Sequence, residues 1–242
     1  MTTEYSYSHM GEGKGHAYDA EFDGSAFLGY LWARERALLT RLIQQEGARL
    51  GKGLDYLDFA CGTGRIISAL EDSVSRAVGL DISPTMMEQA RDRVTSAELI
   101  LGNVFEDPEL LTDTFDVVTS FRFFPNADPA LRVRAAEFLR ERVRPGGLFI
   151  MNNHQNARSV LCTAARAAGK KWPWTEADNR EVVRLISDSG FRLEGKYGLG
   201  MLPGTARRAY APLWMHALVD GTARGVGASE WAQNVIMWFR PQ

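Results

Sequence analysis

The sequence predicts an α/β fold in which a doubly wound, mostly parallel sheet ends in one antiparallel strand and carries additional helical cap elements. Three observations predict it. Short apolar segments alternate with helix-like segments through the middle of the chain, the connections between them are short, and a glycine-rich turn follows the first apolar segment. Alternation of this kind is typical of parallel strands joined by crossover helices.

The chain before the first predicted strand is expected to form a cap. Residues 27–50 carry apolar side chains at helical spacing, and Gly51 and Gly53 end that pattern. Residues 1–26 are polar and rich in Gly, Tyr and His, and they lack the apolar centre of a secretory signal. We therefore expect a single domain over residues 1–242 in which residues 1–50 form an N-terminal cap segment.

The predicted core alternates strands and helices. Its strands are the apolar segments 54–59, 74–80, 97–102, 115–121 and 147–152. A helix is expected from Arg65 to Leu70 after the first strand. Ser83-Pro84 and Asp128-Pro129 each place an N-cap residue before a proline at the first helical position, so they predict the start of two further helices.

The last third of the chain is less regular. The sequence predicts a helix over 157–168, a second that begins at a capping box from Thr175 to Asp178 and runs through Ile186, and a strand over 191–202. A helix over 206–221 and a closing strand over 231–239 follow. Residues 203–228 then form an insertion between the last two strands, which is long enough to be a functional cap rather than a simple connection.

Composition indicates a soluble globular protein. The chain has 242 residues, 45% of them hydrophobic and 24% charged, and no apolar run of the roughly 18 residues that a membrane helix needs. A net charge of −2 gives no general attraction to nucleic acid. Cys61 and Cys162 have no metal-ligand spacing around them and are expected to be free thiols in the cytoplasm. We expect a monomer or homodimer without a membrane or nucleic-acid partner.

The most informative segment is residues 58–64, Asp-Phe-Ala-Cys-Gly-Thr-Gly. Glycines allow the backbone to approach a ligand closely, because no Cβ stands in the way. The start of the next helix offers unpaired N–H groups to a polar or negative ligand. A strand, a glycine turn and a helix therefore indicate a nucleotide-like cofactor at the carboxyl end of the sheet.

Three observations narrow the cofactor. The dinucleotide pattern G-x-G-x-x-G is incomplete, because Ile67 stands where its third glycine is required. Asp81 follows the second strand, where a carboxylate can accept hydrogen bonds from both ribose hydroxyls. Asp58 precedes the glycine turn, a position that favours a positively charged ligand group over a pyrophosphate. Because no P-loop Lys-Ser/Thr pair follows, a nucleoside triphosphate is also disfavoured.

These segments resemble the class I S-adenosylmethionine-dependent methyltransferases. Residues 57–64 resemble the family's first motif, [DE]-x-G-x-G-x-G, and residues 78–86 resemble its second. Residues 101–104 resemble the third motif, and segments 115–118 and 144–148 complete the set in the family's order and spacing. The resemblance implies a Rossmann-like sheet with a cofactor-binding core over 54–152, S-adenosylmethionine as methyl donor and S-adenosylhomocysteine as product.

The resemblance also implies the residues that bind the cofactor. It assigns Asp81 to the ribose, Ile82 to the side of the adenine and Asn103 to the adenine amine. The full expected set is Asp58, Ala60, Cys61, Gly62, Gly64, Asp81, Ile82, Met86, Asn103, Val104 and Phe121. Two positions depart from the family pattern. Ala60 replaces a glycine, which tightens the loop, and Asn103 replaces the common aspartate, so its amide oxygen must accept the adenine hydrogen bond.

The loop after the fourth strand bears on the methyl acceptor. Residues 120–126, Ser-Phe-Arg-Phe-Phe-Pro-Asn, differ from the [DN]-P-P-[YF] loop with which nucleic-acid amino-methyltransferases hold an exocyclic amine. The aromatic character of the loop suits an apolar or planar acceptor, and Phe123 and Phe124 are the predicted contacts. Packing in the protein core explains either ring equally well.

Two histidines are candidate catalytic residues. His154 follows the fifth strand, and an imidazole can remove a proton near neutral pH or orient the acceptor. His216 lies in the insertion and is the second candidate. Both also suit a structural role. The N-terminal segment and the insertion are the expected walls of the acceptor site, with Tyr18, Phe22, Tyr30 and Trp214 as the candidate contacts.

The sequence therefore predicts a methyltransferase that modifies an O or N atom of a small, apolar or aromatic metabolite, without a metal ion. Modification of tRNA, rRNA or a protein side chain is the alternative, and C-methylation of a quinone or sterol is a further one. A protein that binds the cofactor without transferring a methyl group is a third class. Turnover with an acceptor would separate this class from the enzymes.

Overall fold

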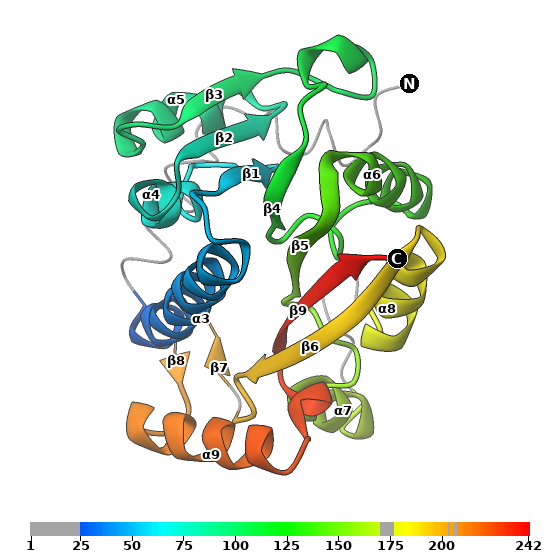
Figure 1. The fold of residues 1–242 in the computed structure, drawn as a ribbon. Coiled ribbons are helices and arrows are strands. Elements are labelled where there is room, and N and C mark those ends of the chain that lie inside the picture. The colour runs from blue at the N-terminus through cyan, green and yellow to red at the C-terminus, as the bar shows by residue number, and fades with distance from the viewer. Residues whose placement is uncertain (1–24, 170–176, 203, 206–207) are drawn as a thin grey trace.

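The computed structural model describes residues 25–169, 177–202, 204–205 and 208–242 (Figure 1). Within these residues the main feature is a 7-stranded sheet with the order β3-β2-β1-β4-β5-β9-β6. Its strands are β1 (Asp55–Phe59), β2 (Arg76–Asp81), β3 (Glu98–Leu101), β4 (Phe115–Ser120), β5 (Val143–Asn153), β6 (Phe191–Leu199) and β9 (Asn234–Pro241).

The strand directions confirm the predicted fold class. Strands β1 to β5 pair in parallel, while β9 pairs antiparallel with both β5 and β6. The chain begins at the middle of the sheet with β1, extends to β3 at one edge and then returns through β4 to the other side. This reversal places the carboxyl ends of β1 and β4 side by side, and it is the position where open α/β sheets bind ligands.

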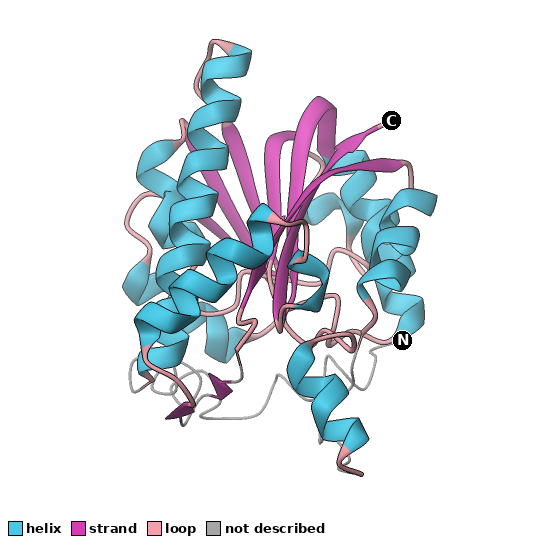
Figure 2. Cartoon of the chain, turned by 90° about the horizontal axis from the view of Figure 1, so that it is seen from below, coloured by secondary structure: helices cyan, strands magenta, loops and turns pink. Residues whose placement is uncertain are grey.

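Helices cover both faces of the sheet (Figures 1 and 2). They are α3 (Ala26–Leu50), α4 (Ile67–Leu70), α5 (Pro84–Arg93), α6 (Pro129–Arg142), α7 (Val160–Ala167), α8 (Asn179–Asp188) and α9 (Leu213–Gly225). Short 3₁₀ turns occur at η1 (Glu71–Ser73), η2 (Pro108–Leu110) and η3 (Ser229–Trp231), and a small hairpin joins β7 (Gly204–Thr205) to β8 (Arg208–Ala209).

The two apolar layers follow from alternation along the strands. Leu57 and Val118 face the cluster that includes α6 and α8, whereas Tyr56 and Val117 face the cluster that includes α3 and α4. Successive side chains of a strand point to opposite faces, so a strand buried on both faces must be apolar almost throughout. All six residues of β4 are buried, as this position in the sheet requires.

The predicted helix starts are confirmed where a cap and a proline coincide. The Ser83 side chain accepts a hydrogen bond from the Met86 N–H at the start of α5, and Asp128 accepts one from the Leu131 N–H at the start of α6. Both hydrogen bonds satisfy N–H groups that have no partner inside the helix. Helix α3 begins in the same way, with Ser25 as its N-cap.

Several predicted boundaries were wrong in the last third. The helix predicted over 206–221 is α9, which begins after Pro212 because a proline fits the start of a helix but not its interior. The closing strand begins at Asn234 rather than 231, since η3 occupies the preceding residues. Strand β6 ends at Leu199, before the left-handed Gly200 (φ 77°), rather than at 202.

Smaller differences concern helix starts and the fifth strand. The N-cap of α8 is Asp178, whose Oδ1 accepts from the Arg180 N–H at 2.7 Å, and the predicted cap Thr175 lies outside the described residues. Helix α7 begins at Val160 because Ser159 caps it, and β5 extends back to Val143. The helix expected from Arg65 to Leu70 is confined to α4, followed directly by η1.

Candidate functional site

The loop after β1 has the backbone geometry that its glycines allow. Gly62 (φ 56°) and Gly64 (φ 74°) both lie in the left-handed region. An added Cβ at Gly64 would lie 3.1 Å from the Ala90 Cβ, whereas one at Gly62 would meet nothing within 4 Å. The first glycine therefore keeps the surface of the loop open, and the second allows α5 to pack closely beneath it.

Ala60 shares this left-handed geometry although it has a side chain. Its φ is 57°, a conformation that costs a residue with a Cβ about 1–2 kcal/mol. The family pattern has a glycine at this position, so the structure explains the predicted tightening of the loop as backbone strain. The next residue, Cys61, donates its N–H to the Leu80 carbonyl at 3.0 Å, which ties the loop to the end of β2.

Asp81 at the end of β2 is held by backbone amides from two segments. Its Oδ2 accepts from the Gly62 N–H at 2.8 Å, and its Oδ1 accepts from the Ser83 N–H at 2.9 Å. A carboxylate has about four acceptor sites, so Asp81 can accept from ligand hydroxyls in addition to these amides. The carboxylate is thus fixed in orientation beside the glycine turn.

Asp58 is a buried acid beneath the same turn. The Thr119 hydroxyl donates to its Oδ1 at 2.7 Å and is itself 2.6 Å from the Tyr56 hydroxyl. Its Oδ2 is buried without a hydrogen-bond partner among the described residues. Burial raises the pKa of Asp58 to about 7, and the Thr119 hydrogen bond offsets part of this rise. An unpaired buried acceptor of this kind suits a positively charged ligand group.

The remaining predicted cofactor residues line the ends of β2, β3 and β4. Met86, Val104 and Phe121 are buried, while Ile82 and Asn103 are partly exposed. The Asn103 Oδ1 accepts from the Phe105 N–H at 3.0 Å, so the loop after β3 is held in a tight turn by the residue that was predicted to contact adenine.

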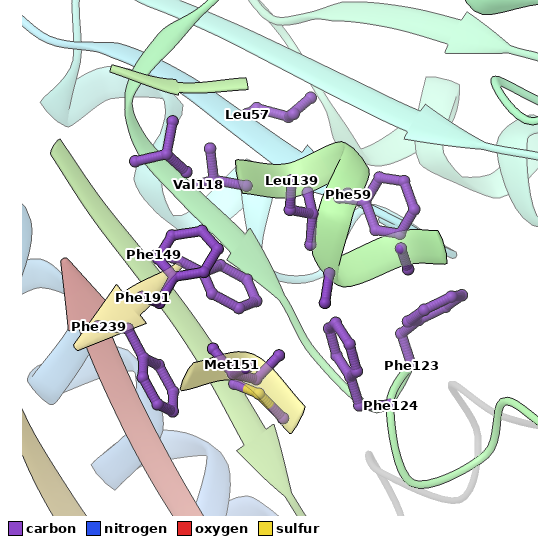
Figure 3. Close-up of a cluster of buried hydrophobic side chains, with 14 of the residues drawn as sticks. Leu57, Phe59, Val118, Phe123, Phe124, Leu139, Phe149, Met151, Phe191 and Phe239 are labelled. Atoms are coloured by element: carbon purple, nitrogen blue, oxygen red, sulfur yellow. The ribbon is translucent and has the colours of Figure 1, made fainter. Parts of the chain in front are cut away.

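Phe123 and Phe124 lie in the apolar cluster on the α6 side of the sheet (Figure 3). The Phe123 ring centroid is 5.2 Å from that of Phe59 and 5.3 Å from that of Phe124, which in turn lies 6.0 Å from Phe149. Phe124 is fully buried. Core packing therefore accounts for both rings, and their predicted contact with an acceptor has no support in these neighbours.

His154 directly follows β5. Its Nδ1 is buried without a hydrogen-bond partner among the described residues. The pKa of His154 is well below its usual value, first because of burial and then because of the positive charges of Arg122 and Arg65. The imidazole is therefore neutral near pH 7 and can accept a proton or a hydrogen bond. No contact between His154 and His216 occurs among the interactions described for this part of the chain.

His216 lies in a contact between the cap helices instead. It is fully buried on α9, with its ring 5.1 Å from Phe27 and 5.9 Å from Tyr30, both on α3. The Tyr30 hydroxyl donates to Asp220 Oδ2 at 2.8 Å, and burial together with this hydrogen bond raises the pKa of Tyr30 well above its usual value. Tyr30 and His216 thus join α3 to α9.

Of the remaining predicted acceptor contacts, only Trp214 lies within the described residues. Trp214 is 67% exposed on α9, and Tyr18 and Phe22 lie outside the described residues. Within the described part of the chain, no cluster of metal-ligating side chains occurs and no helix is long and apolar enough to cross a membrane.

The comparisons with known proteins agree with this geometry. A family model described as a methyltransferase domain matches residues 57–147, which span the glycine turn, Asp81 and the start of β5. Over these residues the chain is similar to methyltransferase domains, and solved structures of S-adenosylmethionine-dependent methyltransferases share its fold. The cofactor of these methyltransferases is S-adenosylmethionine. The buried Oδ2 of Asp58 and the fixed carboxylate of Asp81 fit it, because it carries both a positively charged amino group and a ribose.

The curated relatives that the chain resembles differ in name. The chain is 41% identical over 174 residues to an 18S rRNA (guanine-N(7))-methyltransferase of Bos taurus. The match covers 66% of this chain and 56% of the relative. The chain is 27% identical over 121 residues to a ubiquinone biosynthesis O-methyltransferase of Coxiella burnetii, which covers 48% and 50% of the two chains. The chain thus spans about half the length of the curated relatives it matches.

Solved structures show that the methyltransferase fold extends over almost the whole chain. A S-adenosylmethionine-dependent methyltransferase of Thermotoga maritima, titled a possible histamine N-methyltransferase, has a TM-score of 0.62 at 17% identity and covers 97% of this chain and 99% of that one. An N-methyltransferase of Bradyrhizobium japonicum in complex with S-adenosyl-L-homocysteine has a TM-score of 0.58 at 13% identity and covers 91% and 90%.

Sequence reasoning missed several polar residues near the carboxyl ends of the strands. Arg122 adopts a left-handed conformation (φ 62°), and its N–H donates to the buried Asn152 Oδ1 at 2.7 Å. Glu35 on α3 is 1% exposed and pairs with Arg65. A charged residue among the apolar positions of α3 was the one available signal, since helix periodicity places Glu35 between Leu31 and Leu38 on the buried face.

Proposed function

We propose that this protein transfers the methyl group of S-adenosylmethionine to an O or N atom of a small-molecule acceptor. The single observation that carries the proposal is the pair of carboxylates at the glycine turn. Asp81 is fixed by the Gly62 and Ser83 amides, and Asp58 is buried beneath the turn with an unsatisfied Oδ2. Together they complement a ligand that has a ribose and a positive charge but no phosphate.

The chemistry divides between cofactor and protein. S-adenosylmethionine supplies an activated methyl group on a sulfonium, so the protein needs chiefly to position the acceptor and exclude water. Asp81 would hold the ribose, Asp58 the positively charged end, and Ile82 and Asn103 the adenine. His154, neutral near pH 7, would accept the proton that an acceptor hydroxyl or amine loses.

A second candidate function has support from one comparison. The relative from Bos taurus, which is 41% identical to this chain over 174 residues, is named an 18S rRNA (guanine-N(7))-methyltransferase. Methylation of rRNA by this chain would call for a positively charged surface, because phosphate contacts dominate RNA affinity. The net charge of −2 favours the small-molecule acceptor. C-methylation of a quinone and cofactor binding without transfer remain the further alternatives.

The test of cofactor binding is calorimetry with S-adenosylhomocysteine. Asp81→Ala removes the proposed hydrogen-bond acceptor for the ribose. We expect the dissociation constant of S-adenosylhomocysteine to rise about tenfold or more, which corresponds to a loss of at least about 1.4 kcal/mol of binding free energy. Asp113→Ala is the matched control, since Asp113 is an exposed carboxylate that pairs with Arg76. Equal affinity of the Asp81 variant and the parent protein would refute the ribose assignment.

The test of transfer is turnover. Screening acceptors by mass, for a gain of one methylene, identifies the substrate class and separates the small-molecule proposal from rRNA, which is tested in parallel. His154→Ala is expected to lower kcat while the affinity for S-adenosylhomocysteine is unchanged. If kcat does not change with the identified acceptor, His154 has a structural role.

A further inference from the structure

Helix α3 contacts strand β9 of the sheet through one buried glutamate. Glu35 Oε1 accepts from the Asn234 Nδ2 at 2.6 Å, and Glu35 Oε2 lies 3.4 Å from the Arg65 guanidinium. The same guanidinium lies over the Trp32 ring, 4.5 Å from its centroid. A buried carboxylate requires a charged or hydrogen-bonded partner, which Arg65 provides for Glu35. Two residues of α3, Glu35 and Trp32, therefore hold the Arg65 guanidinium in place.

The hydrogen bonds continue across the sheet to the end of β4. Asn152 on β5 donates to Asn234 Oδ1 at 3.1 Å and accepts from the Arg122 N–H at 2.7 Å. The side chains of Glu35, Asn234 and Asn152 are all buried. We call Glu35, Asn234 and Asn152 the Glu35 relay. It connects the residue after the glycine turn with the residue after β4, on two segments that are far apart in sequence.

The relay holds Arg122 in an unusual backbone conformation. A φ of 62° is rare for a residue with a side chain, and such residues concentrate at functional sites. Two hydrogen bonds fix it, since the Arg122 carbonyl also accepts from the Asn126 Nδ2 at 2.6 Å. The chain thus keeps a strained arginine at the carboxyl end of a strand where an unstrained glycine would fit.

Arg65, Arg122 and His154 follow three neighbouring strands. Arg65 follows the turn after β1, Arg122 follows β4 and His154 follows β5, and these strands are adjacent and parallel in the sheet. Their carboxyl ends therefore lie at one edge. The positive charges of both arginines lower the pKa of His154, which supports their position around its ring.

We propose that Arg65 and Arg122, positioned by the Glu35 relay, form together with His154 a binding site for a carboxylate group of the methyl acceptor. The proposal rests on the function proposed above and narrows its acceptor to an anionic small molecule. Guanidinium groups bind carboxylates through paired N–H donors, and a partly buried site strengthens that attraction. The neutral His154 then lies beside the bound anion, where it can orient the acceptor or accept its proton.

The position in the sheet separates Arg122 and His154 from the proposed ribose contact. Asp81, the proposed ribose contact, follows β2, on the far side of β1 from β4 and β5. Arg122 and His154 thus lie away from the ribose end of the site. The cofactor also has a carboxylate, so the experiment must distinguish these two sources of the same group.

Two isosteric probes test the site without knowledge of the acceptor. Benzoate and benzamide are titrated by ligand-observed NMR against protein saturated with S-adenosylhomocysteine. We expect benzoate to bind at least about tenfold more tightly than benzamide, and Arg122→Gln to remove this preference while the affinity for S-adenosylhomocysteine stays within about twofold. Equal binding of the two probes overturns the proposal, and so does a tenfold loss of S-adenosylhomocysteine affinity, because the anion would then belong to the cofactor.

The relay is tested by a matched pair of variants on α3. Glu35→Gln removes the charge that orients Arg65, whereas Glu46→Gln removes a second buried glutamate on the same helix, which pairs with Arg49 and Arg240. Both variants are expected to lower the unfolding temperature. Only Glu35→Gln is expected to reduce the benzoate preference, by about fivefold, which marks Glu35 as a positioning residue.

The outcomes separate this inference from the proposed function. If Glu35→Gln and Glu46→Gln leave the benzoate preference equally unchanged, the relay has a structural role and its part of the proposal fails. If S-adenosylhomocysteine binds and requires Asp81 but benzoate shows no preference, the carboxylate site fails and the methyltransferase proposal stands. If S-adenosylhomocysteine does not bind, both fail.

Discussion

The proposed cofactor side and the proposed acceptor side of the site are built from different kinds of contacts. Near Asp81 the hydrogen-bond partners lie close in sequence, 2 residues away for Ser83 and 19 for Gly62. Near Glu35 and Tyr30 they lie far apart, 199 residues for Asn234 and 190 for Asp220. The first side is encoded in short motifs. The second exists only after the chain has folded, which is why acceptor choice can change while the cofactor motifs remain.

The difference predicts how each side responds to mutation. On the proposed cofactor side the glycine turn needs left-handed backbone and, at Gly64, close packing, so an added Cβ is costly there. On the acceptor side buried polar pairs determine it, so removal of one partner leaves the other unsatisfied. Four predictions test this contrast, from the largest expected effect to the smallest.

Gly64→Ala is expected to have the largest effect. The new Cβ requires a left-handed alanine and would lie 3.1 Å from Ala90, so strain and overpacking together should lower the free energy of unfolding by about 3–4 kcal/mol. Gly62→Ala is the control, because its Cβ meets nothing within 4 Å and only the conformational cost of about 1–2 kcal/mol applies. Urea unfolding measures both. Equal losses would contradict the packing role of Gly64.

Asp58 should make stability depend on pH. Because its pKa rises from 3.8 in the unfolded chain to about 7 in the folded one, folding favours the protonated acid. The stability from this group is therefore present below pH 4 and is lost as the pH rises to 7, by about 2–3 kcal/mol between pH 5 and 8. The Asp58→Asn variant should not lose this stability as the pH rises, because an asparagine side chain does not ionise. Urea unfolding of both proteins at pH 5 and pH 8 gives the difference, and identical pH profiles would contradict the raised pKa.

Tyr30→Phe tests the contact between the cap helices. The substitution removes the hydroxyl that donates to Asp220 at 2.8 Å. A hydrogen bond of this kind to a carboxylate contributes about 2 kcal/mol, so the free energy of unfolding should fall by that amount. Asp220 also accepts from the Gly200 and Met201 N–H groups, so α9 keeps part of its attachment. The affinity for S-adenosylhomocysteine should not change, and a loss of it would show that the cap supports the cofactor side.

Ala60→Gly should have the smallest effect, and a stabilising one. Glycine relieves the left-handed strain at φ 57° but loses more entropy on folding, so the net gain should be about 0.5 kcal/mol. Thermal unfolding measures it. A destabilised variant would show that the Ala60 methyl group makes packing contacts that outweigh the strain.

Much of the core could be predicted from local signals. Ser83 and Asp128 cap the expected helices, β1 to β5 correspond to the predicted apolar segments, and the closing strand is antiparallel as predicted. Prediction failed where a tertiary contact overrides the local pattern. Helix α9 was placed too early because nothing in residues 206–212 signals the β7–β8 hairpin, and Pro212 was not recognised as its start.

Candidate site residues divide in the same way. Asp58 and Asp81 could be proposed from the sequence because both lie close to a recognisable glycine turn. His216 was proposed to be catalytic from its residue type, yet the structure places it between Phe27 and Tyr30 in the cap. Arg122 gave no sequence signal, because its left-handed backbone is imposed by Asn152 and Asn126 rather than by its own preferences.

The sequence by itself determined the sheet, the glycine turn and the class of cofactor, because strand alternation, helix caps and left-handed glycines depend on residues that are neighbours in the chain. The tertiary structure alone decided which polar groups meet at the proposed acceptor side. Burial of Glu35 requires partners that remove its desolvation cost, and these come from β9 and from the turn after β1. Sequence spacing carries no record of such pairs, since it is the folded sheet that brings them together.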